Sequence, residues 1–150
     1  LIQSHHWRRT CGSLYRRYLL GADANNDRAS LERAYDDGLG VTAAFDKNVL
    51  AHVNHTHDAT FDLDAFTHRA VWDASHHRVE MHLVSMRAQR VRIGATVVGF
   101  ERGEVIVTEH CYKHPREAMA AMLTAAGWRT LRVDADPRGR MHLWLATRSA

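Results

Sequence analysis

The spacing of hydrophobic positions changes twice along this 150-residue chain. Residues 15–27, YRRYLLGADANND, predict a buried strand that ends at a Gly/Asp/Asn cluster, a pattern typical of the carboxyl end of a parallel strand, where α/β proteins bind ligands. Ser30 is the expected N-cap of a helix. Apolar residues then recur at helical spacing over 41–53. The pattern therefore predicts a strand followed by two helices joined by a glycine turn.

The hydrophobic period becomes two after residue 66, which indicates β structure. The strand-like runs are residues 68–74, 78–86, 89–94, 96–100 and 104–112. Short turn segments separate these runs, so we expect an antiparallel meander. A helix beginning at Pro115 and a hairpin over 130–148 follow. This order predicts an α/β protein in which an α+β domain is inserted into a doubly wound sheet.

Composition narrows the class of protein. A hydrophobic content of 45% is enough for one globular core, and no apolar run reaches the ~20 residues that a membrane helix needs. The formal charge of +3 is spread along the chain among acidic residues, which argues against nucleic-acid binding. Cys11 and Cys111 lie too far apart for a CxxC motif, and a reducing, cytoplasmic location is expected. Because the chain starts at Leu1 without an initiator methionine, we expect it to be part of a longer protein.

The segment VIVTEHCYKHP, residues 105–115, places a cysteine between histidines. This pattern raises two hypotheses, a zinc site and a Cys/His nucleophile pair. In a strand, neighbouring side chains point to opposite faces, so His110 and Cys111 diverge and cannot act as a nucleophile and its base. Strict alternation instead puts Glu109 and Cys111 on one face, with Thr108 on the other and about 6.5 Å between the first two Cα atoms. That spacing suits a planar ring held beside both side chains.

The chain has 12 histidines, and HVNHTH brings three of them together at residues 52, 55 and 57. A carboxylate or cysteine at a matching interval, as in HExxH, does not accompany them. Solvated histidines at a polar helix end therefore fit this segment better than a metal site.

Four segments, taken together, resemble the histidine-specific, S-adenosylmethionine-dependent methyltransferases. They are residues 34–54, 61–73, 78–83 and 108–113. This family trimethylates the α-amino group of L-histidine to hercynine, the first step of ergothioneine biosynthesis. The resemblance implies the carboxyl-terminal half of a Rossmann-type methyltransferase fold with an inserted substrate-recognition domain. Residues 1–28 and 114–150 would then belong to the Rossmann core and residues 29–113 to the recognition domain.

The resemblance also implies which residues bind substrate. Glu109 matches the glutamate that hydrogen-bonds the substrate imidazole, and Met81 matches the methionine that packs beside that ring. Tyr35 matches the tyrosine at the substrate carboxylate end, while Phe45 matches the aromatic residue that lines the pocket. Cys111 stands where the family usually has serine, beside the second imidazole nitrogen.

A second departure is Asp46, which replaces the common asparagine after the pocket aromatic. The family's S-adenosylmethionine site lies mostly in the amino-terminal half, and this chain has no GxGxxG-like stretch. We therefore expect the isolated chain to bind the cofactor weakly and to have little catalysis. The expected partner is a small-molecule substrate, L-histidine or a related amino acid, with no nucleic acid or membrane partner, and a monomer is expected. The alternative is a non-catalytic module that binds amino acids or amines.

Overall fold

The computed structural model describes residues 17–149. The chain divides into two compact units, an outer unit made of both chain ends, up to Asn26 and from Tyr112 onward, and an inserted unit, Asp27–Cys111. The first 16 residues of the predicted core segment 1–28, Cys11 among them, lie outside the described residues. Among the described helices, none has the length and apolar character that crossing a membrane requires.

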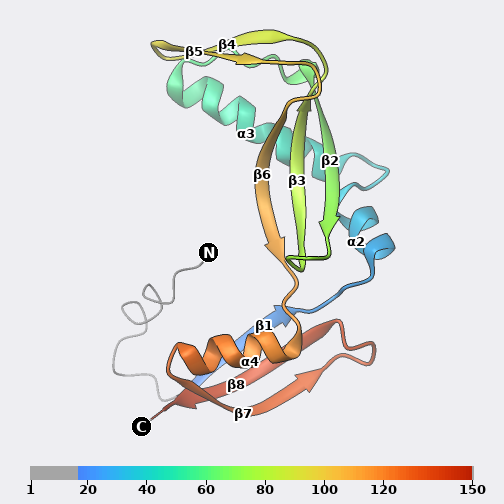
Figure 1. Ribbon diagram of the computed structural model, residues 1–150, viewed down its shortest axis with the longest axis vertical. Coiled ribbons are helices and arrows are strands. Elements are labelled where there is room, and N and C mark those ends of the chain that lie inside the picture. Colours follow the sequence, from blue (N-terminus) through green and yellow to red (C-terminus); the bar gives the residue numbers. More distant parts are fainter. Residues whose placement is uncertain (1–16, 150) are drawn as a thin grey trace. The chain divides into compact units, whose positions relative to one another are not determined.

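The inserted unit begins with two α-helices and continues with short strands. Its elements are α2 (Arg28–Tyr35), α3 (Val41–His57), the 3₁₀ turn η1 (Leu63–Ala65), β2 (Phe66–Asp73), β3 (Arg78–Ser85), β4 (Gln89–Ile93), β5 (Thr96–Phe100) and β6 (Val105–Tyr112). The strands form a β2-β3-β6 sheet and a separate β4-β5 hairpin (Figure 1). The strands themselves were predicted correctly.

The prediction of one continuous meander was wrong, because β6 pairs with β3 and the β4-β5 hairpin is looped out between them. Local contacts hold this hairpin to the end of α3 and to the segment that follows it. The N–H of Thr60 donates to the carbonyl of Arg92 (2.9 Å), and the N–H of Gly94 donates to the carbonyl of His57 (2.9 Å). Period-two spacing identifies strands but does not identify their neighbours.

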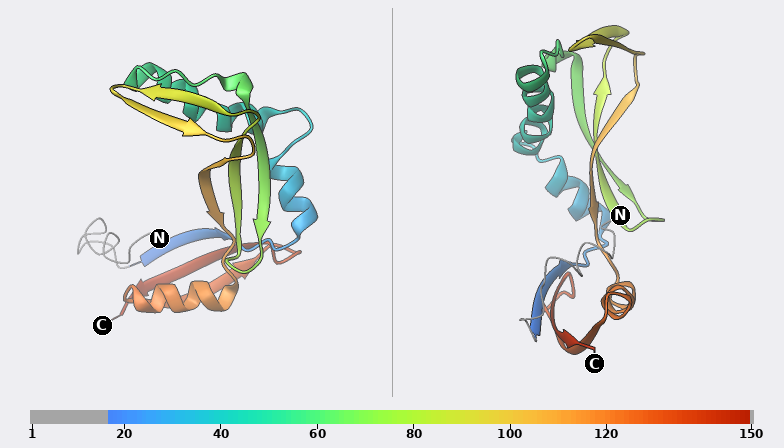
Figure 2. Two further views of the ribbon diagram at one scale, coloured as in Figure 1. Left: turned by 45° about the horizontal axis from the view of Figure 1, so that its top comes forward. Right: turned by 90° about the vertical axis from the view of Figure 1, so that its left-hand side faces the viewer.

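Helices α2 and α3 cover one face of the β2-β3-β6 sheet (Figures 1 and 2). The core of this unit is an aromatic and aliphatic cluster formed by Leu50, Phe61, Ala65, Phe66, Leu83, Val91 and Phe100. Helix α3 turns Asp46 and Leu50 into the unit and leaves Val41, Phe45 and Val49 exposed. The apolar spacing over 41–53 therefore predicted the helix correctly but marked mostly its outer face.

The two helix starts differ from one another. Helix α2 begins at Arg28 with Asp27 as its N-cap, so the prediction of Ser30 as the cap was wrong. The hydroxyl of Ser30 lies inside the first turn and donates to the carbonyl of Asp27. Helix α3 follows Gly40, whose φ of 73° is accessible to glycine at little cost. The carboxylate of Asp37 caps its first turn by accepting the N–H groups of Val41 and Thr42.

The outer unit is a three-stranded sheet with one helix. Its elements are β1 (Arg17–Asp23), α4 (Arg116–Ala125), β7 (Trp128–Ala135) and β8 (Met141–Arg148), and the strand order is β1-β8-β7. The strand over β1 was predicted to be a buried parallel strand. The strand is instead partly exposed, without a buried residue. Its neighbour in the described sheet is β8, which is antiparallel to both β1 and β7, so that β1 and β7 run in the same direction.

Helix α4 packs on one face of this sheet, where Met119, Leu123, Trp128, Trp144 and Ala146 form the core. The opposite face is also apolar. Leu19, Met141 and Leu143 point to it and are 62%, 50% and 43% exposed. Both faces of β8 are therefore hydrophobic, but the described residues cover only one of these faces.

Candidate functional site

Strand β6 changes face between Thr108 and Cys111. The hydroxyl of Thr108 reaches a carboxylate oxygen of Asp46 on α3, and Cys111 contacts Tyr35 on α2, so both point to the helix-covered face. The prediction that strict alternation separates these two residues was therefore wrong.

Tyr35 and Cys111 form a direct contact within the predicted site. Tyr35 is the last residue of α2, and its phenol donates a hydrogen bond to the Sγ atom of Cys111 with an O···S distance of 2.8 Å. Both residues are partly exposed. The structure thus brings together two of the five predicted substrate-binding residues, one from the helix layer and one from the sheet.

The other three predicted residues differ in exposure. Met81 is buried on β3, and its carbonyl oxygen lies 3.0 Å from the hydroxyl of Thr108. Glu109 is exposed on β6, and no hydrogen bond or ion pair found within residues 17–149 involves its carboxylate. Phe45 projects from α3 and is 65% exposed. Glu109 and Phe45 are therefore accessible to a ligand, while the side chain of Met81 is buried.

A buried polar network lies between these residues. The Nδ1 atom of His68 on β2 lies 2.7 Å from Oδ2 of Asp46, and its Nε2 atom lies 2.7 Å from the carbonyl oxygen of Tyr35. The side chains of His68 and Asp46 are both 1% exposed. Thr108 donates to the other carboxylate oxygen of Asp46. The network joins α2, α3, β2 and β6 directly beneath Tyr35.

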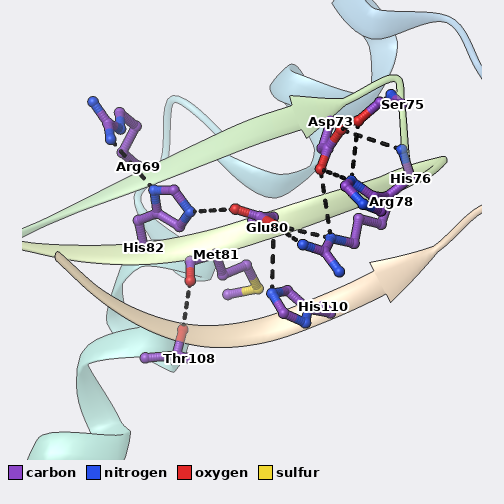
Figure 3. Close-up of polar contacts among 10 residues, drawn as sticks. All are labelled: Arg69, Asp73, Ser75, His76, Arg78, Glu80, Met81, His82, Thr108 and His110. Atoms are coloured by element: carbon purple, nitrogen blue, oxygen red, sulfur yellow. Dashed lines mark hydrogen bonds and ion pairs between the residues drawn. The ribbon is translucent and has the colours of Figure 1, made fainter. Parts of the chain in front are cut away.

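A second polar group occupies the opposite face of the sheet, as Figure 3 shows. Glu80 accepts from Arg78 (Nε, 2.9 Å) and from His82 (Nε2, 2.9 Å), and His110 lies 3.4 Å away. The hydrogen bond from His82, followed by that from Arg78, lowers the pKa of Glu80 below its usual range. Arg69 donates to Nδ1 of His82, so the proton of that ring is on Nε2.

Among residues 17–149 no set of three or more His, Cys, Asp or Glu side chains is arranged to hold a metal ion.

Sequence reasoning missed the Asp46–His68 pair, although a signal for it exists. Phe66, His68 and Ala70 alternate on β2, which places the imidazole on the same face as a core phenylalanine. Asp46 precedes the buried Leu50 by one helical turn. A buried histidine and a buried aspartate need partners, and each is the other's partner.

Comparisons with known proteins identify the family. Residues 4–148 match the family model described as histidine-specific methyltransferase, SAM-dependent. The histidine N-alpha-methyltransferase of Mycolicibacterium smegmatis is 47% identical over 132 residues, and that of Mycobacterium tuberculosis is 46% identical over 132 residues. Each alignment covers 87% of this chain and 41% of the relative, so the chain spans about two fifths of the curated relatives' length. The chain therefore belongs to the histidine-specific, S-adenosylmethionine-dependent methyltransferases, as the resemblance in its motifs predicted.

Proposed function

We propose that the protein containing this chain transfers methyl groups from S-adenosylmethionine to the α-amino group of L-histidine. The product is hercynine, the precursor of ergothioneine. The chain supplies the histidine-binding part of the enzyme, and residues 29–113 are its substrate-recognition domain. The observation that carries this proposal is the contact between Tyr35 and Cys111, because it brings together two of the residues implied to bind the substrate from positions far apart in the sequence.

The accessible groups suit an imidazole ring. The carboxylate of Glu109 accepts the ring N–H in a charge-assisted hydrogen bond, which is about twice as strong as a neutral one. The thiol of Cys111 contacts the second ring nitrogen. The family resemblance assigns Met81 and Phe45 to the pocket, and of these Met81 is buried while Phe45 projects from the exposed face of α3. The phenol of Tyr35 lies beside the thiol of Cys111. An amino acid without the ring N–H leaves Glu109 unsatisfied and is rejected.

The outer unit supports the assignment of residues 1–28 and 114–150 to a Rossmann-type core. A sheet with helices on both faces has apolar residues on both faces of its strands. Strand β8 has this character, while α4 covers one face. We infer that further segments of the full protein cover Leu19, Met141 and Leu143 and extend the sheet beyond β1.

The described residues do not fit S-adenosylmethionine, because no glycine-rich loop joins a strand to a helix among them. The cofactor supplies an activated methyl group, and no step of the transfer is assigned to this chain. Its own residues hold the histidine so that the amine has a fixed position, and such positioning accounts for a large part of the rate in a displacement reaction.

The test uses the full-length protein that contains this chain, purified and incubated with S-adenosylmethionine and each of the 20 amino acids. Mass spectrometry should detect methylated histidine and no other methylated product. Histidine binding without methylation would instead identify a non-catalytic binding module. Methylation of a different amino acid would contradict the assignment of histidine as the substrate. Titration of the isolated chain with S-adenosylmethionine should give no micromolar binding.

A further inference from the structure

The imidazole of His68 has an acceptor at each of its ring nitrogens. The carbonyl oxygen of Tyr35 cannot donate, so Nε2 of His68 carries a proton and donates it. One oxygen of Asp46 accepts from the hydroxyl of Thr108, and the other lies 2.7 Å from Nδ1. One further proton is held between Nδ1 and Asp46. The pair is therefore neutral as a unit, and the hydrogen bond between its two members depends on that shared proton.

The carbonyl of Tyr35 is one of the last in α2, and such carbonyls have no partner inside the helix. The partial negative charge of a helix carboxyl end favours a cationic imidazole there. His68 satisfies this carbonyl from the sheet, while Asp46 fixes the ring from α3. The backbone of Tyr35 is thereby held at one end, and its phenol is held by Cys111 at the other.

We propose that Asp46 and His68 are positioning residues that fix Tyr35 for substrate binding, an inference that rests on the proposed function. They touch no substrate. Thr108 extends the same network to β6, the strand that carries Glu109 and Cys111. One buried network thus fixes the end of α2 that carries Tyr35 relative to the strand that carries Glu109 and Cys111.

Asparagine at position 46 can make the same hydrogen bond to His68 as Asp46 does. The asparagine that the family commonly has at this position can donate its amide N–H to Nδ1 of a neutral imidazole. The asparagine therefore keeps the hydrogen bond to the ring of His68 when that ring carries one proton fewer. Asp46→Asn should therefore preserve the position of Tyr35, whereas an apolar residue at position 46 should not.

The test measures KM and kcat for histidine, together with the Kd for S-adenosylmethionine and the melting temperature, in the full-length protein. The double variant Asp46→Leu/His68→Phe removes both buried polar partners at once, so that neither remains unsatisfied. We expect a KM for histidine raised by about tenfold or more, since one charge-assisted hydrogen bond to the Tyr35 backbone is lost. The Kd for the cofactor should not change. The single variant Asp46→Asn should keep the KM for histidine within about twofold of that of the unsubstituted protein.

Two further variants keep the test decisive. Thr108→Val is isosteric, removes the link to β6, and should raise KM a few-fold even if the double variant does not fold. His82→Phe, on the same strand layer but on the opposite face, is the matched control and should leave KM unchanged. An active enzyme whose KM is unaffected by Thr108→Val, or by a folded double variant, would overturn the inference. An unsubstituted protein that does not methylate histidine would overturn the proposed function instead.

Discussion

Tyr35 donates a hydrogen bond from its phenol to the thiol of Cys111, 76 positions later in the chain. One residue ends α2 and the other lies near the end of β6. A shift of the helix along the sheet therefore changes the geometry of this contact. The strength of this contact depends on the sulfur atom, because a thiol is a weaker hydrogen-bond partner than a hydroxyl.

Cys111→Ser should tighten histidine binding in the full-length protein. A serine hydroxyl accepts from Tyr35 and bonds the second imidazole nitrogen more strongly than the thiol does. We expect the Kd for histidine, measured by calorimetry, to fall several-fold. Cys111→Ala is the control and should weaken binding. Weaker binding by the serine variant would show that the natural ligand prefers sulfur and is not histidine.

Glu109→Gln should impair histidine methylation strongly. The substitution removes the charge from the hydrogen bond to the ring N–H, at a cost of about 1.5–3 kcal/mol, which corresponds to roughly 10–100-fold in kcat/KM. Glu101→Gln, in the exposed turn after β5, is the control for net charge and should have no effect. Equal activity of the two variants would show that Glu109 does not bind the substrate.

Phe45→Ala should separate binding from stability. The side chain is 65% exposed, so its loss should change the free energy of unfolding by no more than about 0.5 kcal/mol. The KM for histidine should nevertheless rise. Val49→Ala, one helical turn away on the same exposed face, should leave both quantities unchanged. A large loss of stability for Phe45→Ala would mean that the residue packs in the full protein without contacting substrate.

Asp37 should make the stability of the inserted unit depend on pH. Hydrogen bonds from Thr42, supported by the N–H of Val41, lower the pKa of Asp37 to about 2. A carboxyl group whose pKa is lower in the folded state stabilises the fold above its unfolded pKa, near 3.9, and this contribution is lost as the pH falls toward 2. The denaturant midpoints of the unsubstituted protein and of Asp37→Ala should differ at pH 6 and converge near pH 2. Asp36→Asn controls for net charge, and a constant difference across this range would contradict the assignment.

Lys113 forms a buried ion pair that joins the two points where the chain leaves and re-enters the outer unit. Its Nζ atom lies 2.7 Å from Oδ2 of Asp23, and its side chain is 3% exposed. Lys113→Met leaves Asp23 partly hydrated, so we expect a loss of about 2 kcal/mol rather than the full cost of an isolated buried charge. Urea denaturation measures this loss. Lys47→Met on α3 is the control, and equal stabilities of the two variants would exclude a structural role for the pair.

Strand and helix positions could be predicted from the sequence because they depend on local spacing. Period two located β2, β3 and β6, and Pro115 with Gly127 bracketed α4. The neighbour of a strand is not a local property, and the pairing of β6 with β3 across the β4-β5 hairpin was missed for that reason.

The same limit applies to the site. The motif resemblance selected Tyr35 and Cys111, which the structure brings into contact. The buried pair of Asp46 and His68 lies 22 positions apart on a helix and a strand. Its two residues are polar, and a hydrophobic pattern assigns polar residues to the surface. Only the packing of α3 on β2 shows that each compensates the other.

Because the outer unit is built from two separate stretches of the chain, the two units can fold at different times during synthesis. Strand β1 pairs with β8, where Arg17 lies opposite Thr147, so this pairing cannot form until β8 has been synthesised. Residues 27–111 are contiguous and can close around their phenylalanine cluster well before that moment. The inserted unit can therefore fold before β1 and β8 of the outer unit pair.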